Sequence, residues 1–309
     1  MAENFADTLR EVEYVNNVTH TLRQEPGILY TLAGSTGNYA GRSEAKIEDR
    51  FSRLKMQRKT TRNGDTNLTD TSVERRFIKK PGRYNVATLI DRDDIDVTSV
   101  DLKSPLIRET ASAARTYHDD AFLAGFWGDA WIGAETAQST VAFPSANKVA
   151  HNFGGVSVGL TLAKLIELKR LLRKASVNFS TEKPIILLDA DAEADLFNIE
   201  KYVSFDYQGS KPLVDGELKP WMGFRFLPAN LGDPEAYPES ASLFQVGGLN
   251  RLPVIVPSGL HRGVWVEFWG KTDPRSDKQY SEQIYAEAES TVTRTDEKKA
   301  WFIETKPVS

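Results

Sequence analysis

The protein contains no cysteine among its 309 residues, so the chain can form no disulfide, thiolate nucleophile or cysteine-based metal site. Histidine is also scarce, with four residues: His20, His118, His151 and His261. The longest apolar runs, such as PIILL, are far shorter than the ~20 residues that a membrane-spanning helix needs. The N-terminus has no basic region followed by an apolar run, so we expect no signal peptide. These absences favour a protein kept in a cytoplasm-like compartment, with no membrane partner.

Net charge is small as well. The formal charge at pH 7 is −4, which gives no overall bias toward nucleic acid. The charge is nevertheless distributed unevenly along the chain. Residues 41–83 hold 13 Lys and Arg against 6 Asp and Glu, whereas residues 91–101 hold 5 acids against 1 base. A long basic segment followed by an acidic patch suggests a protein that docks onto copies of itself.

The basic segment has few large apolar side chains, so it has little with which to build a core of its own. The sequences KIEDRFSRLKMQRKT and VERRFIKKPGRYNVATLI read as two extended arms around a polar tip. Asn63-Gly64 at that tip is a strong turn signal. We therefore predict a long two-stranded hairpin.

The sequence ADTLREVEYVNNV near the N-terminus is predicted to form a short amphipathic helix, with Leu9 and Val12 on one face. Two longer segments are also predicted to be helical. Residues 104–127 are rich in alanine, with Ser104 as a good N-cap and glycines from Gly125 onward to close the helix. The sequence TLAKLIELKRLLRKASV carries an apolar stripe of leucine and isoleucine, with Thr161 as its N-cap. The intervening residues 128–158 are predicted to be irregular.

Strands dominate the later part of the chain. KPIILLDADAEADLFN reads as a buried strand, a cap and a helix, and WMGFRFLPANL and RLPVIVPSGLHRGVWVEFWGK read as further strands. Residues 281–309 are predicted to form a short helix followed by two strands. Helices first and strands later favour an α+β fold over a regular βαβ series.

The strongest candidate for a catalytic site is IILLDADAEAD, in which a predicted strand ends at Asp189 and Asp191. Some nucleotide-sugar transferases bind a divalent metal at such a pair, so a metal-dependent transferase is one alternative function. A calcium loop fits poorly, because it needs Gly at its sixth position and this chain has Ala194. The favoured interpretation is structural: one aspartate caps the following helix, and the next acids favour its dipole.

His118 lies beside two carboxylates, Asp119 and Asp120, within the predicted long helix. Neighbouring positions on a helix point in different directions, and metal-binding pairs usually lie three or four residues apart. We therefore interpret His118 as an ordinary histidine on the helix surface. The glycine-rich stretch GSTGNYAG lacks the lysine of a phosphate-binding loop. No metal site, cofactor or catalytic constellation is predicted, and the chain is predicted not to be an enzyme.

A second alternative is a nucleic-acid-binding protein that uses residues 41–85. Their cations could contact phosphates, but aromatic side chains suited to base stacking are few: Phe51, Phe77 and Tyr84. Charge pairing with the acidic patch is the favoured role of these cations. A single exposed pair contributes only ~0–1 kcal/mol, but a network sheltered in a repeated interface contributes more.

The order of these parts resembles that of tailed-bacteriophage major capsid proteins, which have the Hong Kong 97 capsid fold. The resemblance covers essentially the whole chain and also has local support. The acidic run IDRDDID before SPLIRETASAARTYHDDAFLAGFWG resembles the start of the family's spine helix. The stretches LAKLIELKRLLRKASV, KPIILLDADAEADLF and GELKPWMGFRFLPAN resemble its axial domain. The ending from HRGVWVEFWGK onward resembles the last part of its peripheral domain.

The resemblance implies an α+β fold of the Hong Kong 97 type in five parts. These are an N-terminal arm (1–40), an extended loop (41–85), a peripheral domain with the spine helix (86–150), an axial domain (151–259) and a return to the peripheral domain (260–309).

The resemblance also implies a major capsid protein that self-assembles into hexamers and pentamers, which form an icosahedral shell around double-stranded DNA. The implied partners are further copies of the chain, the packaged DNA on the inner face, and separate scaffolding, portal and decoration proteins. The implied location is the virion capsid, after assembly in the host cytoplasm. The extended loop would lie on an adjacent subunit. The residues expected to form charged contacts there are Arg50, Arg53, Lys55, Arg58 and Lys59, with Asp91, Asp93, Asp94, Asp96 and Asp101 as acidic positions.

Overall fold

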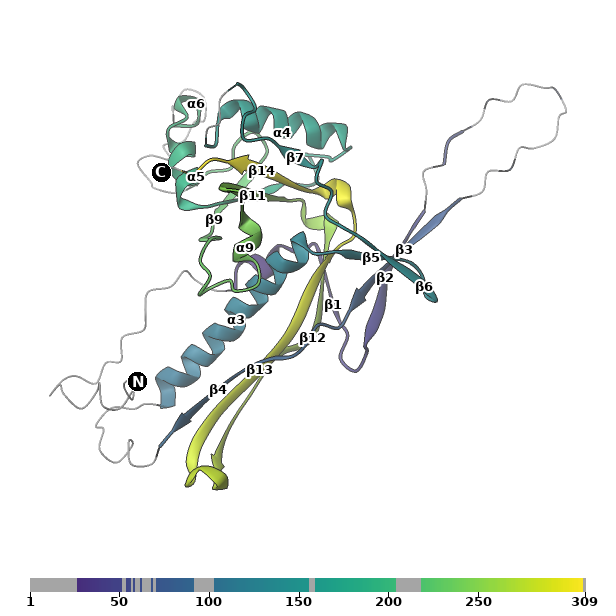
Figure 1. Ribbon diagram of the computed structural model, residues 1–309. Coiled ribbons are helices and arrows are strands. Elements are labelled where there is room, and N and C mark those ends of the chain that lie inside the picture. The colour runs from purple at the N-terminus through teal and green to yellow at the C-terminus, as the bar shows by residue number, and fades with distance from the viewer. Residues whose placement is uncertain are drawn as a thin grey trace.

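The described part of the chain forms three β-sheets, one long helix and several short helices in a computed structural model (Figure 1). The structure describes residues 27–51, 54–56, 58, 62, 68, 71–91, 103–155, 159–203 and 218–307. No helix in these ranges is long and apolar enough to cross a membrane.

The first sheet contains the longest strands. Its order is β1 (Ser35–Asn38), β12 (Leu260–Arg275), β13 (Ser281–Arg294) and β4 (Tyr84–Ile90). β12 and β13 are antiparallel and are joined through η3 (Ser276–Lys278), so they form one long hairpin (Figure 1). β1 pairs in parallel with the start of β12 only.

Helix α3 (Lys103–Trp127) runs alongside this long hairpin (Figure 1). A Cβ atom at Gly125 would lie 2.2 Å from the carbonyl oxygen of Val292 in β13. Glycine therefore allows the backbones of α3 and β13 to approach each other closely. The helix predicted over residues 104–127 is confirmed: α3 ends at Trp127, directly before Gly128, and begins at Lys103, one residue before the predicted cap Ser104. Gly125, also predicted to close the helix, lies inside its last turn.

The second sheet builds the main hydrophobic core. Its order is β7 (Lys148–Val149), β14 (Ala300–Thr305), β11 (Leu249–Ile255), β8 (Ile185–Leu188) and β9 (Arg225–Pro228), with β10 (Gln245–Val246) beside β11. All four residues of β8 are buried, which confirms the predicted buried strand.

Short helices pack on this second sheet. They are α4 (Leu162–Lys174), α5 (Ala190–Phe197), α6 (Glu200–Val203) and α9 (Ala241–Phe244). α4 buries Leu165, Leu168 and Leu172 in the main core, as its apolar stripe predicts. Thr161 is its N-cap, also as predicted, and its side chain accepts a hydrogen bond from the backbone of Lys164.

The third sheet has the order β2 (Glu44–Phe51), β3 (Val73–Lys79), β5 (Ala130–Ala134) and β6 (Ala137–Val141). β2 and β3 are antiparallel, which confirms the predicted pairing of the two arms of the basic segment. The second arm is divided, however, because β4 joins the first sheet. The predicted turn at Asn63-Gly64 lies outside the described residues.

Two further predictions of secondary structure are wrong. Residues 128–158 are not irregular throughout, since they contain β5, β6 and β7. The short helix predicted at residue 281 is instead the start of β13, which pairs with β12 on one side and β4 on the other. Ile284, Ala286 and Ala288 are buried in alternation along it, which is the period of a strand.

The described end of the predicted arm packs on the body of its own chain. Its 3₁₀ turn η1 (Leu29–Leu32) buries Leu29 and Leu32 in the main core. Two further 3₁₀ turns are η2 (Pro257–Gly259) and η4 (Glu297–Lys299). The helix predicted near the N-terminus lies outside the described residues.

Candidate functional site

Three consecutive residues of α3 are buried: His118 is 3%, Asp119 1% and Asp120 2% exposed. Successive side chains on an α-helix point roughly 100° apart. Each of the three side chains therefore contacts a different part of the fold. Because the three residues join α3 to these parts, we call them the helix junction.

Asp119 fastens η1 to the long helix. Its carboxylate accepts hydrogen bonds from the backbone N–H of Gly27, at 2.7 Å, and of Tyr30, at 2.9 Å. Burial raises the pKa of Asp119, although these backbone donors act in the opposite direction. The chain leading into β1 is thus held to α3 by one buried carboxylate.

Asp120 fastens the segment that leads into α9. Its carboxylate accepts hydrogen bonds from the backbone N–H groups of Glu239 and Ser240, both at 3.0 Å, and from the Ser240 hydroxyl at 2.7 Å. Burial raises the pKa of Asp120, and the donors from Ser240 and Glu239 oppose this shift. Asp120 therefore connects α3 to a segment about 120 residues later in the chain.

His118 connects α3 to the long hairpin. Its Nε2 lies 2.6 Å from the carbonyl oxygen of Glu267, and its Nδ1 lies 2.6 Å from the hydroxyl oxygen of Ser290. A carbonyl can only accept, so Nε2 carries the proton and Nδ1 accepts from the serine hydroxyl. The prediction of a helix-surface histidine is wrong, because β12 and β13 cover this side of α3.

A second buried histidine, His261 in β12, holds β1. Its Nδ1 lies 2.7 Å from the Ser35 hydroxyl and its Nε2 lies 2.8 Å from the Tyr39 hydroxyl. The ring of Tyr30 meets His118 edge-on, with 5.5 Å between ring centroids. Both histidines therefore contact residues 27–40, which we call the N-terminal segment.

We expect the packing of the N-terminal segment to depend on pH. Burial lowers the pKa of both His118 and His261; at His118, the bond to the Glu267 carbonyl opposes this shift and Arg262 adds to it. Because histidine in an unfolded chain has a pKa near 6.5, the unfolded state binds more protons below that value and the folded state loses stability. Acidification from about pH 7.5 to about pH 5.5 should speed amide hydrogen exchange in the N-terminal segment severalfold, after correction for intrinsic rates.

Replacing both histidines, as His118→Gln with His261→Gln, should flatten this pH dependence. His151→Gln is the control, since its side chain is 33% exposed and the dependence should remain. Asp119 and Asp120 change the stability in the opposite direction. Because their pKa values are raised in the folded state, the folded state binds more protons than the unfolded one and gains stability as pH falls toward about 3.8. Exchange rates in the N-terminal segment that stay constant in the unmodified protein would contradict the expectation.

We call the hairpin formed by β2 and β3 of the basic segment the basic hairpin. Its base is bonded to the body of the chain. Arg50 donates to the backbone oxygen of Thr295 and to the carboxylate of Asp296, both at 2.8 Å. Arg76 donates to both carboxylate oxygens of Glu297, at 2.5 and 2.7 Å. Arg50, one of the predicted contacts between subunits, thus has a partner within its own chain. The hairpin leaves the body from a fixed base.

Beyond this base the basic hairpin exposes apolar and cationic side chains together. Leu54 is 62%, Met56 103% and Leu68 90% exposed, and Lys55 and Arg58 are also exposed. Burial of such apolar side chains in an interface lowers the free energy of the assembly, because it removes them from water. Asp91 is exposed, whereas Arg53, Lys59, Asp93, Asp94, Asp96 and Asp101 lie outside the described residues.

Asp189 is a helix cap, which confirms the structural interpretation of the DADAEAD segment. One carboxylate oxygen accepts from the backbone N–H of Ala192 at 2.9 Å, and the other accepts from the amide of Asn250 at 2.7 Å. Asp191 lies in the first turn of α5. The described residues contain no group of three or more His, Cys, Asp and Glu that could hold a metal ion.

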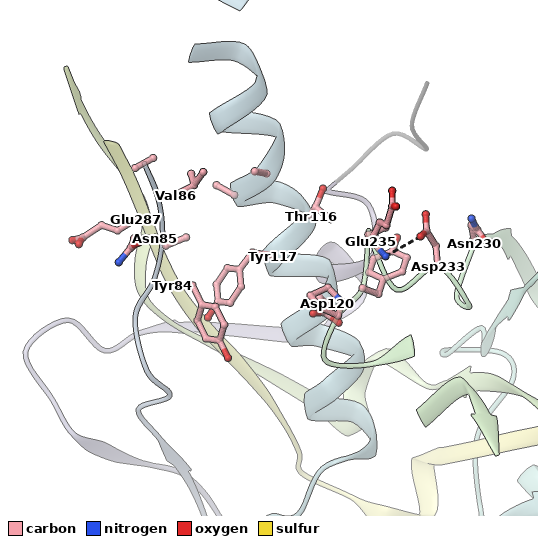
Figure 2. Close-up of a pocket in the computed structure, with 17 residues that line it drawn as sticks. Tyr84, Asn85, Val86, Thr116, Tyr117, Asp120, Asn230, Asp233, Glu235 and Glu287 are labelled. Carbon is pink, nitrogen blue, oxygen red and sulfur yellow. Dashed lines mark hydrogen bonds between the residues drawn. The ribbon is translucent and has the colours of Figure 1, made fainter. Parts of the chain in front are cut away.

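A pocket of about 500 Å³ lies beside α3 (Figure 2). α3 contributes Ala113, Thr116 and Tyr117 on one face of the helix. β4 and β13 lie on one side of this face, and the chain at residues 230–238 lies on the other. The pocket therefore opens where α3, the first sheet and the segment held by Asp120 meet.

The fold is similar to several solved phage capsid structures. The mature capsid of bacteriophage PhiM1 matches with a TM-score of 0.70 at 13% identity, covering 96% of this chain and 93% of that one. The capsid of cyanophage P-SCSP1u matches with a TM-score of 0.73 at 9% identity, covering 96% and 93%. The head of Helicobacter pylori bacteriophage KHP40 matches with a TM-score of 0.69 at 9% identity, covering 95% of each chain. No curated protein sequence matches this chain.

These similarities, together with the long helix, the long hairpin and the projecting basic hairpin, define a Hong Kong 97-type α+β fold. The chain belongs to the phage capsid protein family, whose match spans residues 6–306. It is a major capsid protein, a structural subunit that forms the phage shell. This confirms the family and function that the resemblance implies.

Proposed function

We propose that this capsid protein assembles into hexamers and pentamers that close an icosahedral shell around double-stranded DNA. Membership of the phage capsid family supports this proposal. One observation carries it further: the basic hairpin exposes Leu54, Met56 and Leu68 to water in the isolated subunit. Obligate assemblies bury such surfaces between their subunits.

We also propose the five-part division of the chain that its resemblance implies. Residues 1–40 form the arm and residues 41–85 form the extended loop. Residues 86–150 and 260–309 form the peripheral domain, and residues 151–259 form the axial domain. The pairing of β4 and α3 with the β12–β13 hairpin supports the peripheral domain, and β8, β9 and β11 support the axial one. β14 completes the second sheet from the C-terminal part of the chain.

The extended loop is proposed to lie on an adjacent subunit, where its cations face the acidic patch after β4. The cations are Arg50, Arg53, Lys55, Arg58 and Lys59, and the acids are Asp91, Asp93, Asp94, Asp96 and Asp101. Complementary charge steers association and fixes register more than it adds affinity. Because Arg50 already pairs with Asp296, its contact with a neighbour would extend an existing ion pair.

Reversing the exposed loop charges should impair assembly at low salt. In the variant Lys55→Glu with Arg58→Glu, attraction to the acidic patch becomes repulsion. We expect the association constant to fall at least roughly tenfold, which corresponds to about 1.4 kcal/mol. Light scattering and negative-stain electron microscopy measure the assembled fraction. The matched control is Arg173→Glu with Lys174→Glu, which reverses two exposed charges at the end of α4. Equal assembly of both double variants would show that the loop charges do not contribute.

Other partners belong to the same proposal. A separate scaffolding protein, a portal and decoration proteins would join the shell, packaged DNA would face its inner side, and assembly would occur in the host cytoplasm. Co-expression with neighbouring genes tests these partners: particles of uniform size should form only when the required partner is present.

A further inference from the structure

The pocket beside α3 is acidic. The described residues that line it include four acids and no Lys, Arg or His. The four acids are Asp120, Asp233, Glu235 and Glu287. Arg83 pairs with Glu287 at 3.0 Å, so it neutralises only that side of the pocket. Glu235 is exposed and Asp233 is half-buried. The negative potential is therefore concentrated along residues 233–235.

One wall of the pocket offers an aromatic surface. The rings of Tyr84 in β4 and Tyr117 in α3 lie 4.6 Å apart, centroid to centroid, and are inclined by 32° (Figure 2). The Tyr84 hydroxyl donates to Glu239 at 3.0 Å, which holds this ring in place. Aromatic faces favour thioether and cationic groups. The pocket thus combines acids that attract a cation with rings that suit a methionine.

The exposed part of the basic hairpin carries this combination of groups. Met56 is 103% exposed, so it does not enter the pocket of its own chain. Lys55 and Arg58 flank it and are exposed as well. The surrounding residues 41–83 hold 13 basic against 6 acidic residues, so the hairpin has the charge opposite to that of the pocket.

We propose that the pocket receives the exposed first arm of the basic hairpin of a second copy, with Met56 against the rings of Tyr84 and Tyr117. In this arrangement Lys55 and Arg58 face Asp233 and Glu235 of the pocket, and the acidic patch is left to the other cations of the loop. This inference rests on the proposed assembly and names the acceptor site for the extended loop. The pocket also adjoins the start of β4, and Asp91 directly follows the end of that strand. A basic hairpin lying along β4 would therefore meet acidic side chains at both ends of that strand.

Disulfide trapping tests the docking directly, because the natural chain has no cysteine. Met56→Cys is combined with Ala236→Cys in the pocket wall, and separately with Ala113→Cys on α3. A disulfide forms only when the two Cα atoms approach to roughly 4.4–6.8 Å. Shells assembled under reducing conditions and then oxidised should yield a ladder of linked chains on a non-reducing gel. The control pairs Met56→Cys with Ile166→Cys, which lies 52% exposed on α4.

We expect roughly tenfold more linkage in a pocket pair than in the control, because docking sets a high local concentration. Shells that form with no more linkage than the control in either pocket pair would overturn the docking but leave the proposed function intact. Failure of the unmodified chain to form shells would overturn both. Linkage of the pocket cysteine to a different protein would also overturn the docking.

A charge-exchange experiment provides a second test of the docking, and it needs no cysteine. Asp233→Lys with Glu235→Lys should restore assembly to the variant Lys55→Glu with Arg58→Glu. Restoration by Asp91→Lys, but not by the pocket substitutions, would overturn the pocket as acceptor and favour the acidic patch.

Discussion

Replacing Arg294 with alanine is expected to lower the free energy of unfolding by on the order of 3 kcal/mol or more. The side chain of Arg294 is fully buried at the end of β13. Its guanidinium donates to the backbone oxygens of Phe126, at 2.7 Å, Gly128, and Val141, at 3.1 Å. Alanine would leave these three carbonyl groups without their donor in a buried region, and each such loss costs roughly 1–3 kcal/mol.

The effect should be specific to this buried position. Arg294 binds the carbonyl groups at the end of α3, where a positive charge also favours the helix dipole. Arg294→Lys retains the charge but cannot reach all three acceptors, so we expect an intermediate loss. Arg275→Ala is the control, because Arg275 lies in an exposed pair with Asp277. Urea unfolding of unassembled subunits, followed by tryptophan fluorescence, measures the difference. A loss for Arg294→Ala no larger than that for Arg275→Ala would contradict this role.

Replacing Asp120 with alanine is expected to cost roughly 2–4 kcal/mol, because it removes the acceptor of three hydrogen bonds at once. Two of the donors are backbone N–H groups at residues 239 and 240, and a buried N–H without a partner is costly. The same segment forms one side of the acidic pocket. We therefore expect residues 237–244 to gain hydrogen exchange, and assembly to weaken beyond the loss of stability alone.

Asp120→Asn separates these effects. The amide oxygen can still accept from the segment, so the loss should be smaller than with alanine. Asp91→Ala is the exposed control and should leave the exchange of residues 237–244 unchanged. Unchanged exchange in the Asp120→Ala variant would show that other contacts hold this segment on α3.

Local sequence patterns predict the elements that local contacts stabilise. The Thr161 cap and leucine stripe of α4, and the Asp189 cap between β8 and α5, follow from neighbours a few residues apart. The pairing of β2 with β3 joins residues that lie farther apart, but it follows from two extended arms on either side of one turn signal. These elements need no knowledge of the rest of the fold.

Predictions from local sequence fail where contacts with distant parts of the chain determine the secondary structure or the burial of a residue. The start of β13 contains alanine and glutamate, which favour a helix, yet it lies between β12 and β4 and becomes a strand. His118 looks like a surface residue because its partners lie 149 and 172 residues away. The alternation of Ile284, Ala286 and Ala288 was a usable signal for the strand. No comparable signal in the sequence marks the helix junction.

The acidic pocket was also not predictable, because Tyr84, Tyr117 and Glu235 come from three distant parts of the chain. The basic hairpin, in contrast, is evident from its charge alone. Sequence therefore indicates one half of the proposed interface, and the fold is needed to find the other half.

Negative-stain electron microscopy of the purified protein, alone and co-expressed with its neighbouring genes, tests the central claim most directly. A major capsid protein should form closed shells, capsomer rings or tubes. Shells built from rings of five and six subunits would match the proposed assembly. Single subunits under every condition, with no rings or shells, would contradict it.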